Sequence, residues 1–279
     1  MKETRHEVRV IDNKDAHLDA GRLVHDRYEY VKGDIRYPKD MEGALDGVDG
    51  VVHLAAVVGE DKYDEDQSVG FETNIIGTRI VAEEAKRRRV RKLVFASTGN
   101  VYGKIKEVAT EDSPVCPVCR YGASKLWGEN DVVGAGYVVV RFGTVCGASP
   151  TMRWDLLPHQ MAKAVVNRES IEIYDPLAWR PFTEIKDATR ALIALVELEP
   201  NPSVSGKVFN VVSENVQKAT LMHYMKELGG VVVAVNKEDK RSYRMDGGLV
   251  DRTIGWRGKG KVKEAMEEVA KGVRDGSVR

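Results

Sequence analysis

The chain has 279 residues, and its 43 Lys and Arg residues balance 43 Asp and Glu residues, so its formal net charge is zero. A neutral chain has no overall field that favours nucleic acid or an anionic membrane surface, so an anionic ligand must be met by local charges. The longest apolar runs, such as VVHLAAVVG, fall far short of the roughly 20 residues of a membrane-spanning helix, and no cleavable apolar leader opens the chain. These features predict a cytoplasmic protein of enzyme size.

Segments typical of strands and helices alternate through the first two thirds of the chain. Val-rich strands separated by helices indicate a parallel sheet that is covered on both faces. The predicted strands are 6–12, 28–34, 49–56, 92–98 and 136–143, and the predicted helices are 38–47, 74–89 and 121–133. The fold class is therefore α/β, a doubly wound parallel sheet of the Rossmann type, which binds ligands at the carboxyl ends of its strands.

The alternation ends after Gly147. We expect residues 1–147 to form the sheet domain, with 180–200 returning to it, while 148–179 and 201–279 form a smaller mixed lobe that binds substrate. Three cysteines, two of them in Cys116-Pro-Val-Cys119, suggest neither a disulfide framework nor a complete zinc site, so no metal is predicted. The basic tract 86–92 is interpreted as a solvated helix end, because cations there favour the helix dipole.

Tyr121 and Lys125 have the spacing that places two side chains on one face of a helix. A nearby ammonium favours the phenolate, which makes a phenol of ordinary pKa about 10 a plausible base near neutral pH. The same spacing recurs at Tyr28/Lys32, in a strand where the two side chains lie too far apart to pair, and at Tyr102/Lys106, where a turn glycine follows. Only Tyr121 opens a good helix-forming segment.

Ser97 and Thr98 end the predicted strand 92–98. A hydroxyl at the carboxyl end of a central strand faces the ligand crevice, where it can bond a substrate oxygen and share a proton with a tyrosine. Taken alone, the strand-end hydroxyls and the Tyr/Lys pair are each as compatible with a structural role as with a catalytic one. The two together, in this order, favour a catalytic site.

A set of motifs in order along the chain resembles the extended short-chain dehydrogenase/reductase family, in particular its nucleotide-sugar epimerases and dehydratases. The resemblance runs from about Glu7 to the C-terminal helix. The motifs are DGVVHLAA, ETNIIGT, FASTGNVYG, YGASK, VVRFGTVCG and RPFTEIKD. It implies NAD as cofactor, bound by the first domain, a nucleotide sugar as substrate, and a homodimer formed through helices corresponding to 74–86 and 121–129.

By this resemblance Tyr121 is the catalytic acid/base, Thr98 orients the sugar, and Lys125 lowers the pKa of the tyrosine and holds the nicotinamide ribose. Asp12 matches the acid that bonds the adenosine ribose 2′-hydroxyl, which selects NAD over its 2′-phosphorylated relative. His53 is interpreted as a structural residue. The residues expected to contact NAD are Asp12, Asn13, Asp34, Ile35, Leu54, Ala55, Ala56, Asn74, Ser97, Tyr121 and Lys125. Those expected to contact the nucleotide sugar are Thr98, Thr144, Arg180, Asp239 and Arg241.

The residues after Thr98 bear on the reaction that the resemblance implies. The 4,6-dehydratases carry an Asp-Glu pair there, and decarboxylating relatives carry a Glu at the second position, but this chain has Gly99 and Asn100. Inversion at C4 through a 4-keto sugar needs no further acid, so activity like that of UDP-glucose 4-epimerase is expected. Arg180 matches the arginine that the epimerases place on the diphosphate, where its planar fork suits phosphate oxygens.

Three positions depart from the family pattern and loosen the substrate prediction. Glu184 stands where His is usual, Thr144 where many epimerases have Asn, and Arg120 where Pro or Ala precedes the tyrosine.

The glycine-rich phosphate loop of this family follows a first, central strand, and no such loop is found in this sequence. Gly43, Gly47 and Gly50 precede a predicted strand instead of following one, and Gly255, Gly258 and Gly260 lie in the terminal lobe. Three hypotheses stay open. The chain is an epimerase whose first strand and loop are encoded upstream of Met1, an inactive nucleotide-sugar binding protein poor in cofactor, or a 4-keto-sugar reductase that uses NADPH. Asp12 argues against the third.

Overall fold

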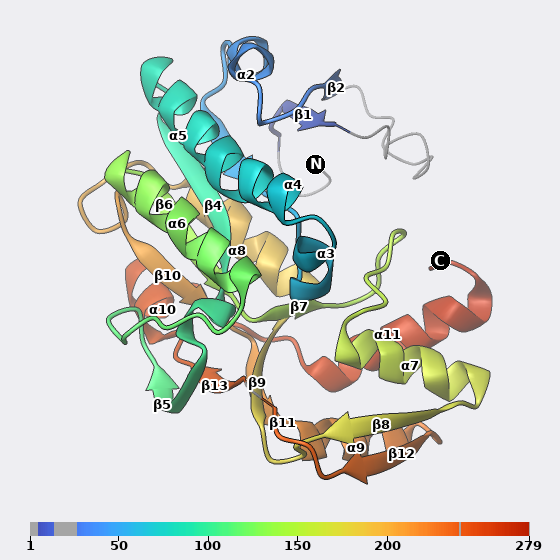
Figure 1. The fold of residues 1–279 in the computed structure, drawn as a ribbon. Helices are drawn as coiled ribbons and strands as arrows, with labels where there is room; N and C mark the ends of the chain where they lie inside the picture. Colours follow the sequence, from blue (N-terminus) through green and yellow to red (C-terminus); the bar gives the residue numbers. More distant parts are fainter. Residues whose placement is uncertain (1–4, 14–26, 240, 279) are drawn as a thin grey trace.

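The computed structural model describes residues 5–13, 27–239 and 241–278. Its centre is a parallel sheet in the order β10-β6-β4-β3 (Figure 1). The strands are β3 (Gly50–His53), β4 (Lys92–Thr98), β6 (Val138–Phe142) and β10 (Val208–Val211). Every residue of β6 is buried, because this strand has helices over both faces. The predicted parallel sheet is confirmed.

Helices cover both faces of this sheet. Phe95 and Val139 pack with Val81 and Val132 of the helices on one face, and Val140 and Phe209 pack with Leu195 on the other. The first face carries α2 (Pro38–Ala44), α5 (Thr78–Arg87) and α6 (Arg120–Gly134), and the second carries α8 (Ile185–Glu197) and α10 (Gly248–Ile254). No helix in the described ranges is long and apolar enough to cross a membrane.

The chain enters α5 through a run of short helical segments. These are α3 (Glu60–Glu65), α4 (Gln67–Phe71) and the π-helix η1 (Glu72–Gly77). Asp66 begins α4, and its carboxylate accepts hydrogen bonds from the backbone N–H groups of Ser68 and Val69. A π-helical turn is a rare departure from α geometry that is frequent at functional sites, and this one contains Asn74.

β1 (Val8–Asp12) and β2 (Tyr28–Lys32) form a separate two-stranded parallel sheet. Both strands occur where the sequence predicts them. Within the described ranges, neither is paired with β3, so the predicted single sheet is divided into two parts. Arg9 on β1 donates to the backbone oxygens of Ala44 and Asp46, at 3.1 and 2.9 Å, which ties the pair to the end of α2 (Figure 1).

The lobe packs around α7 (Leu157–Asn167) and α11 (Val262–Asp275), with Met161 and Met266 fully buried between them. Its other elements are β8 (Ser170–Tyr174), β12 (Val231–Val235) and α9 (Lys218–Glu227). The junction with the sheet domain consists of η2 (Gly99–Tyr102), β5 (Lys104–Ala109), β7 (Thr144–Cys146), β9 (Trp179–Glu184), β11 (Glu214–Gln217) and β13 (Ser242–Met245). One predicted boundary is wrong: residues 208–211, assigned to the lobe, form β10, which pairs with β6 of the central sheet.

Candidate functional site

Tyr121 lies in the first turn of α6, and the start of this helix is fixed by a cysteine. Cys119 is the N-cap residue, and its Sγ accepts a hydrogen bond from the Gly122 N–H at 3.4 Å. The ring of Tyr121 is buried with Tyr63, Val57 and Cys119. The two cysteines therefore differ in role. Cys116 is exposed, whereas Cys119 is buried and caps the helix that carries Tyr121.

Thr98 and Tyr121 meet, as the sequence predicts. Thr98 is the last residue of β4, and its Oγ1 accepts a hydrogen bond from the Asn100 N–H at 3.2 Å, which caps η2. Burial raises the pKa of Tyr121 to about 12, and the charge of Arg153 and a hydrogen bond with Thr98 act in the opposite direction. The site therefore holds a protonated phenol beside a hydroxyl at the carboxyl end of a central strand.

Lys125 lies on α6, four residues after Tyr121, but its electrostatic role differs from the prediction. Its Nζ lies 4.1 Å from the centroid of the Phe95 ring. Burial lowers the pKa of Lys125 to about 7, and the nearby Glu129 raises it only in part. The ammonium is therefore only partly protonated near neutral pH, and the charge that lowers the pKa of Tyr121 most is that of Arg153.

Arg153 is a functional candidate that the sequence did not indicate, because it lies in an irregular segment. Its Nε donates to Asp155 Oδ1 at 3.1 Å. Its backbone oxygen lies 2.9 Å from Nδ1 of the buried His159, whose Nε2 accepts a hydrogen bond from the Gly147 N–H at 3.1 Å. His159 thus ties the segment that carries Arg153 to the end of β7.

Two residues predicted to contact NAD make side-chain contacts within the protein that support the site. The buried Asn74 accepts from the Val57 N–H at 2.7 Å and donates to the Val57 oxygen at 2.9 Å and to Ser124 Oγ at 3.0 Å. Ser97 donates to Glu129 Oε1, and Arg141 binds the same carboxylate through Nε and Nη2. In the described structure, both side chains are turned to protein partners.

The loop that Asn74 holds follows β3 and is open to solvent. Leu54 and Ala55 are exposed and Ala56 is half-buried, so the predicted cofactor-lining residues are accessible at the carboxyl end of the strand. His53 is buried, stacks on Phe95 with ring centroids 5.2 Å apart, and lies 3.1 Å from Thr78 Oγ1. Burial lowers the pKa of His53 to about 3, which is in keeping with the structural role predicted for it.

The predicted adenosine end of the site lies at the carboxyl ends of β1 and β2. Asp12 is exposed, and Asn13 Nδ2 donates to Asp34 Oδ2 at 3.0 Å. Asp34 also binds the Arg36 guanidinium, and this contact lowers the pKa of Asp34 to about 2. The side chain of Ile35 belongs to the core beneath α5, so only its backbone is available for the predicted adenine contact.

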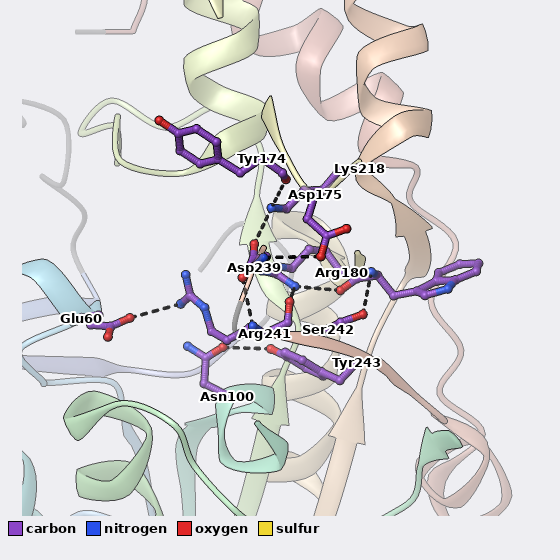
Figure 2. Close-up of polar contacts among 11 residues, drawn as sticks. Glu60, Asn100, Tyr174, Asp175, Arg180, Lys218, Asp239, Arg241, Ser242 and Tyr243 are labelled. Carbon is purple, nitrogen blue, oxygen red and sulfur yellow. Dashed lines mark hydrogen bonds and ion pairs between the residues drawn. The ribbon is translucent and has the colours of Figure 1, made fainter. Parts of the chain in front are cut away.

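Three of the predicted substrate residues form one cluster at the junction with the lobe (Figure 2). The Arg180 guanidinium on β9 pairs with Asp239, and one of its nitrogens donates to the backbone oxygen of Arg241. The Arg241 Nη1 lies 3.8 Å from Glu60 Oε2 of α3. This ion pair therefore links the segment after β12 to the helices that follow β3. Thr144 lies apart from this cluster's polar contacts, at the start of β7.

The two positions after Thr98 are covered by β13. Asn100 Oδ1 accepts a hydrogen bond from the Tyr243 hydroxyl at 3.0 Å. A Cβ on Gly99 would lie 2.5 Å from Met245 Sδ and 2.8 Å from the Tyr243 ring, both of which are buried. A side chain at residue 99 therefore has no room in this packing.

Two of the departures from the family pattern, Glu184 and Arg120, have structural roles. Glu184 is the N-cap of α8 and accepts hydrogen bonds from the Lys186 and Asp187 N–H groups at 2.9 and 3.3 Å. Arg120 pairs with Asp64 of α3 at 3.0 Å. Of the glycines in the terminal lobe, Gly258 and Gly260 pack against Ser213 and Glu184.

Residues 1–212 of the chain match the NAD dependent epimerase/dehydratase family. The chain is 26% identical over 223 residues to the uncharacterized UDP-glucose epimerase YtcB of Bacillus subtilis (strain 168). The aligned region covers 77% of this chain and 69% of that protein. It is 32% identical over 210 residues to the UDP-glucose 4-epimerase of Streptomyces lividans. That aligned region covers 67% of this chain and 61% of that enzyme.

A solved structure shares the fold. The UDP-glucuronic acid 4-epimerase from Bacillus cereus, in complex with UDP-glucuronic acid and NAD, is 23% identical, with a TM-score of 0.86 over 98% of this chain and 93% of that chain. Together with the family match over residues 1–212, this confirms the resemblance seen in the sequence motifs. The chain belongs to the NAD dependent epimerase/dehydratase family.

Proposed function

We propose that the chain is a nucleotide-sugar epimerase that uses NAD to invert C4 of UDP-glucose and UDP-galactose. The observation that carries this proposal is the meeting of Thr98 and Tyr121 at the carboxyl end of β4, beside the buried Lys125. A hydroxyl and a phenol at this place can orient a sugar hydroxyl and move its proton. The names of the relatives in Bacillus subtilis and Streptomyces lividans support a UDP-sugar substrate.

The residues at the carboxyl ends of β1 and β3 fit the cofactor. The exposed Asp12 carboxylate suits a ribose hydroxyl, and the exposed Leu54 and Ala55 suit an aromatic ring, while Asn74 holds their loop from behind. NAD, when bound, accepts a hydride from the sugar carbon and returns it. This fit concerns the ribose and ring contacts, since we assign no residue to the pyrophosphate.

The protein's part in the reaction is proton transfer. In its phenolate form, Tyr121 takes the proton of the sugar 4-hydroxyl while Thr98 orients that oxygen. Together with transfer of the C4 hydride to bound NAD, this would leave a 4-keto sugar. The phenol must act from a pKa that burial has raised to about 12, so the cations near it matter, and Arg153 is the one whose charge lowers that pKa most. After the keto sugar turns its other face, return of the hydride to C4 and of the proton from Tyr121 to the same oxygen would form the inverted alcohol.

Packing around residue 99 supports epimerisation over elimination of water. The 4,6-dehydratases that the chain resembles carry an acid directly after the threonine, and here the space for a side chain at Gly99 is filled by Met245 and Tyr243. Asn100, which is not ionisable, has its side-chain oxygen bonded to Tyr243. The proposed reaction needs only the residues that the site already holds.

A second candidate is a protein that binds nucleotide sugar without turning it over. The division of the sheet favours it, because Asp12 and Thr98 lie on strands of two separate sheets in the described part of the chain. In the described ranges, these sheets are joined by side-chain contacts of Arg9 and Ile11 and not by a strand ladder, which would hold the adenosine ribose and the reacting sugar in one register less firmly. The two candidates differ in whether the purified protein contains NAD.

We further propose a homodimer through α5 and α6, in the cytoplasm. A hollow of about 460 Å³ lies between α6 and the segments that lead into α5, with Phe71 of α4, Ile75 of η1 and Trp127 of α6 among its lining residues. Trp127 and Phe71 are 56% and 49% exposed, and they line the same hollow, so they offer neighbouring apolar surface for a partner helix. Trp127→Glu should therefore convert a dimer to a monomer in light scattering.

The decisive experiment is incubation of the purified protein with UDP-galactose, with and without added NAD, followed by analysis of the sugar. We expect UDP-glucose to form, and Tyr121→Phe to reduce the rate by about 10² to 10⁴, the range for general acid–base catalysis. Tyr28→Phe is the matched control, because Tyr28 and Lys32 have the same spacing on β2. UDP-galactose binding without conversion, in protein free of NAD, would establish the second candidate instead.

A further inference from the structure

Lys218 is a buried cation that no sequence motif indicates. It is the first residue of α9, and its side chain is 8% exposed. A cation at a helix N-terminus is opposed by the helix dipole, and burial lowers the pKa of Lys218 by penalising its charged form. Neither local helix stability nor packing explains a lysine here, since an apolar side chain of similar size would fill the place at lower cost.

The ammonium of Lys218 shares an acceptor with Arg180 (Figure 2). Asp239 Oδ2 accepts from Lys218 Nζ and also from Arg180 Nη2. Because both nitrogens contact one oxygen, they lie within about 6 Å of each other, which is two hydrogen-bond lengths. An anion that reaches Arg180 from this side therefore also reaches Lys218.

Both cations keep donors for a further acceptor. An ammonium has three N–H groups, and within the described structure Lys218 directs two of them, to Asp239 and to the Tyr174 oxygen at 2.8 Å. Arg180 directs Nη1 to the backbone oxygens of Trp179 and Arg241 and one Nη2 bond to Asp239, which leaves Nε and the second Nη2 hydrogen.

The carboxylates around the two cations hold them in place. Asp239 Oδ1 accepts from the Arg241 N–H at 2.9 Å, so the carboxylate that joins Arg180 to Lys218 is itself fixed by the backbone. Asp175 Oδ2 lies 3.4 Å from the Asp239 N–H, and Glu60 faces Arg241. The positive charge of Arg180 contributes to lowering the pKa of Asp239 to about 2, against the effect of burial, so Asp239 stays ionised.

We propose that Lys218 is a second cation of the nucleotide diphosphate site and acts together with Arg180. This proposal rests on the proposed function, in which Arg180 faces the diphosphate. A diphosphate offers oxygens on two phosphorus atoms, so it can accept from an ammonium and a guanidinium at once. Asp239 is then the positioning residue that keeps the two cations side by side.

The test compares UDP with uridine, because uridine lacks the phosphates. We expect Lys218→Met to weaken UDP binding about tenfold or more, the effect of losing a charged hydrogen bond, and to leave uridine binding within about twofold. Lys218→Arg should retain most of the UDP affinity. Lys226→Met, which removes an exposed cation from the last turn of the same helix, should change neither. Calorimetry measures UDP, and saturation-transfer NMR measures the weaker uridine.

Two outcomes would overturn the inference. If Lys218→Met weakens UDP and uridine equally, the lysine only supports the shape of the lobe. If it changes neither, Lys218 does not face the phosphates. Wild-type protein that binds no UDP would refute the proposed function itself, a result that is distinct from both. Thermal unfolding of each variant shows that the comparison is made on folded protein.

Discussion

Two glutamate–arginine pairs in different parts of the fold use the same chemistry in different surroundings. Glu129 of α6 and Arg141 of β6 have side chains that are 4% and 6% exposed, and Arg141 also donates to the Tyr102 hydroxyl at 3.0 Å. Glu29 and Arg9, on β2 and β1, are 58% and 30% exposed. The first pair lies inside the part of the sheet domain that carries Thr98 and Tyr121, and the second on the surface of the β1–β2 pair, which forms a separate sheet.

The difference shows where the fold is strongly specified. Glu129 joins Ser97 of β4 to Arg141 of β6, so the strand that ends in Thr98 is fixed by buried, charge-assisted hydrogen bonds. The β1–β2 pair is fixed by its own ladder and by Arg9, which reaches α2 from the surface. Thr98 and Tyr121 should therefore stay in place under conditions that loosen the β1–β2 pair and with it Asp12.

The largest effect should come from breaking the buried pair. Glu129→Gln leaves the Arg141 guanidinium buried without its counter-charge, which typically destabilises a protein by about 3 to 5 kcal/mol. Urea unfolding followed by circular dichroism measures the loss. The double variant Glu129→Gln/Arg141→Met should recover much of it, because no unpaired charge is left. A loss below about 1 kcal/mol would show that the buried network does not hold together the part of the sheet domain that carries Thr98 and Tyr121.

The next effect concerns pH. The folded-state pKa of Lys125 is about 7, below its ordinary value of 10.5, so between these values the unfolded chain binds a proton that the folded chain does not. Stability from this group should therefore rise with pH across that window, by at most about 1.4 kcal/mol per pH unit. Lys125→Met should remove the rise, while the exposed Lys106→Met should keep it. Parallel pH profiles for wild type and Lys125→Met would contradict the burial effect.

A smaller difference in stability should distinguish a glycine beside the central sheet from a glycine beside the β1–β2 pair. Gly99→Ala places a Cβ against the buried Met245 and Tyr243, and overpacking of this kind costs about 1 to 3 kcal/mol. Gly33→Ala, at the end of β2, meets mainly the terminal methyl of Ile11, which is half-buried and can turn away, so its cost should be smaller. Thermal unfolding of the two variants measures the difference, and equal losses would remove this distinction.

The smallest effect should come from the surface pair. Glu29→Gln removes only an exposed ion pair with Arg9, whose loss is expected to cost about 1 kcal/mol or less and to vanish at high salt. Urea unfolding at low and high ionic strength measures it. A loss as large as that of Glu129→Gln would mean that the β1–β2 pair depends on its surface charges as strongly as the core does on Glu129.

The parts of the site that could be predicted from the sequence are those set by local pattern. Tyr121 opens a helix-forming segment and Thr98 ends a Val- and Phe-containing strand, so their elements and their positions can be predicted along the chain. The same holds for His53, whose strand is continuous and apolar, so that burial was expected. Their meeting then follows from the sheet topology.

The parts that could not be predicted depend on contacts between distant segments. Arg153 and Lys218 lie in an irregular segment and at a helix start, where no periodic pattern assigns a direction to a side chain. The partners of Ser97 and Asn74 lie at least 32 and 17 residues away in the sequence. Their role in supporting the site could therefore not be predicted from local pattern. The strand at 208–211 was missed because only its parallel pairing with β6 gives it a place in the sheet.

The fit of β13 over Gly99 also constrains how this chain can change. An acidic side chain at residue 99 is excluded while Met245 and Tyr243 keep their places, and shrinking Met245 alone leaves a void with no benefit to chemistry. The two positions, 146 residues apart, therefore form an epistatic pair. Laboratory evolution toward a water-eliminating enzyme should find changes in β13 first, and an acid after Thr98 only in their presence.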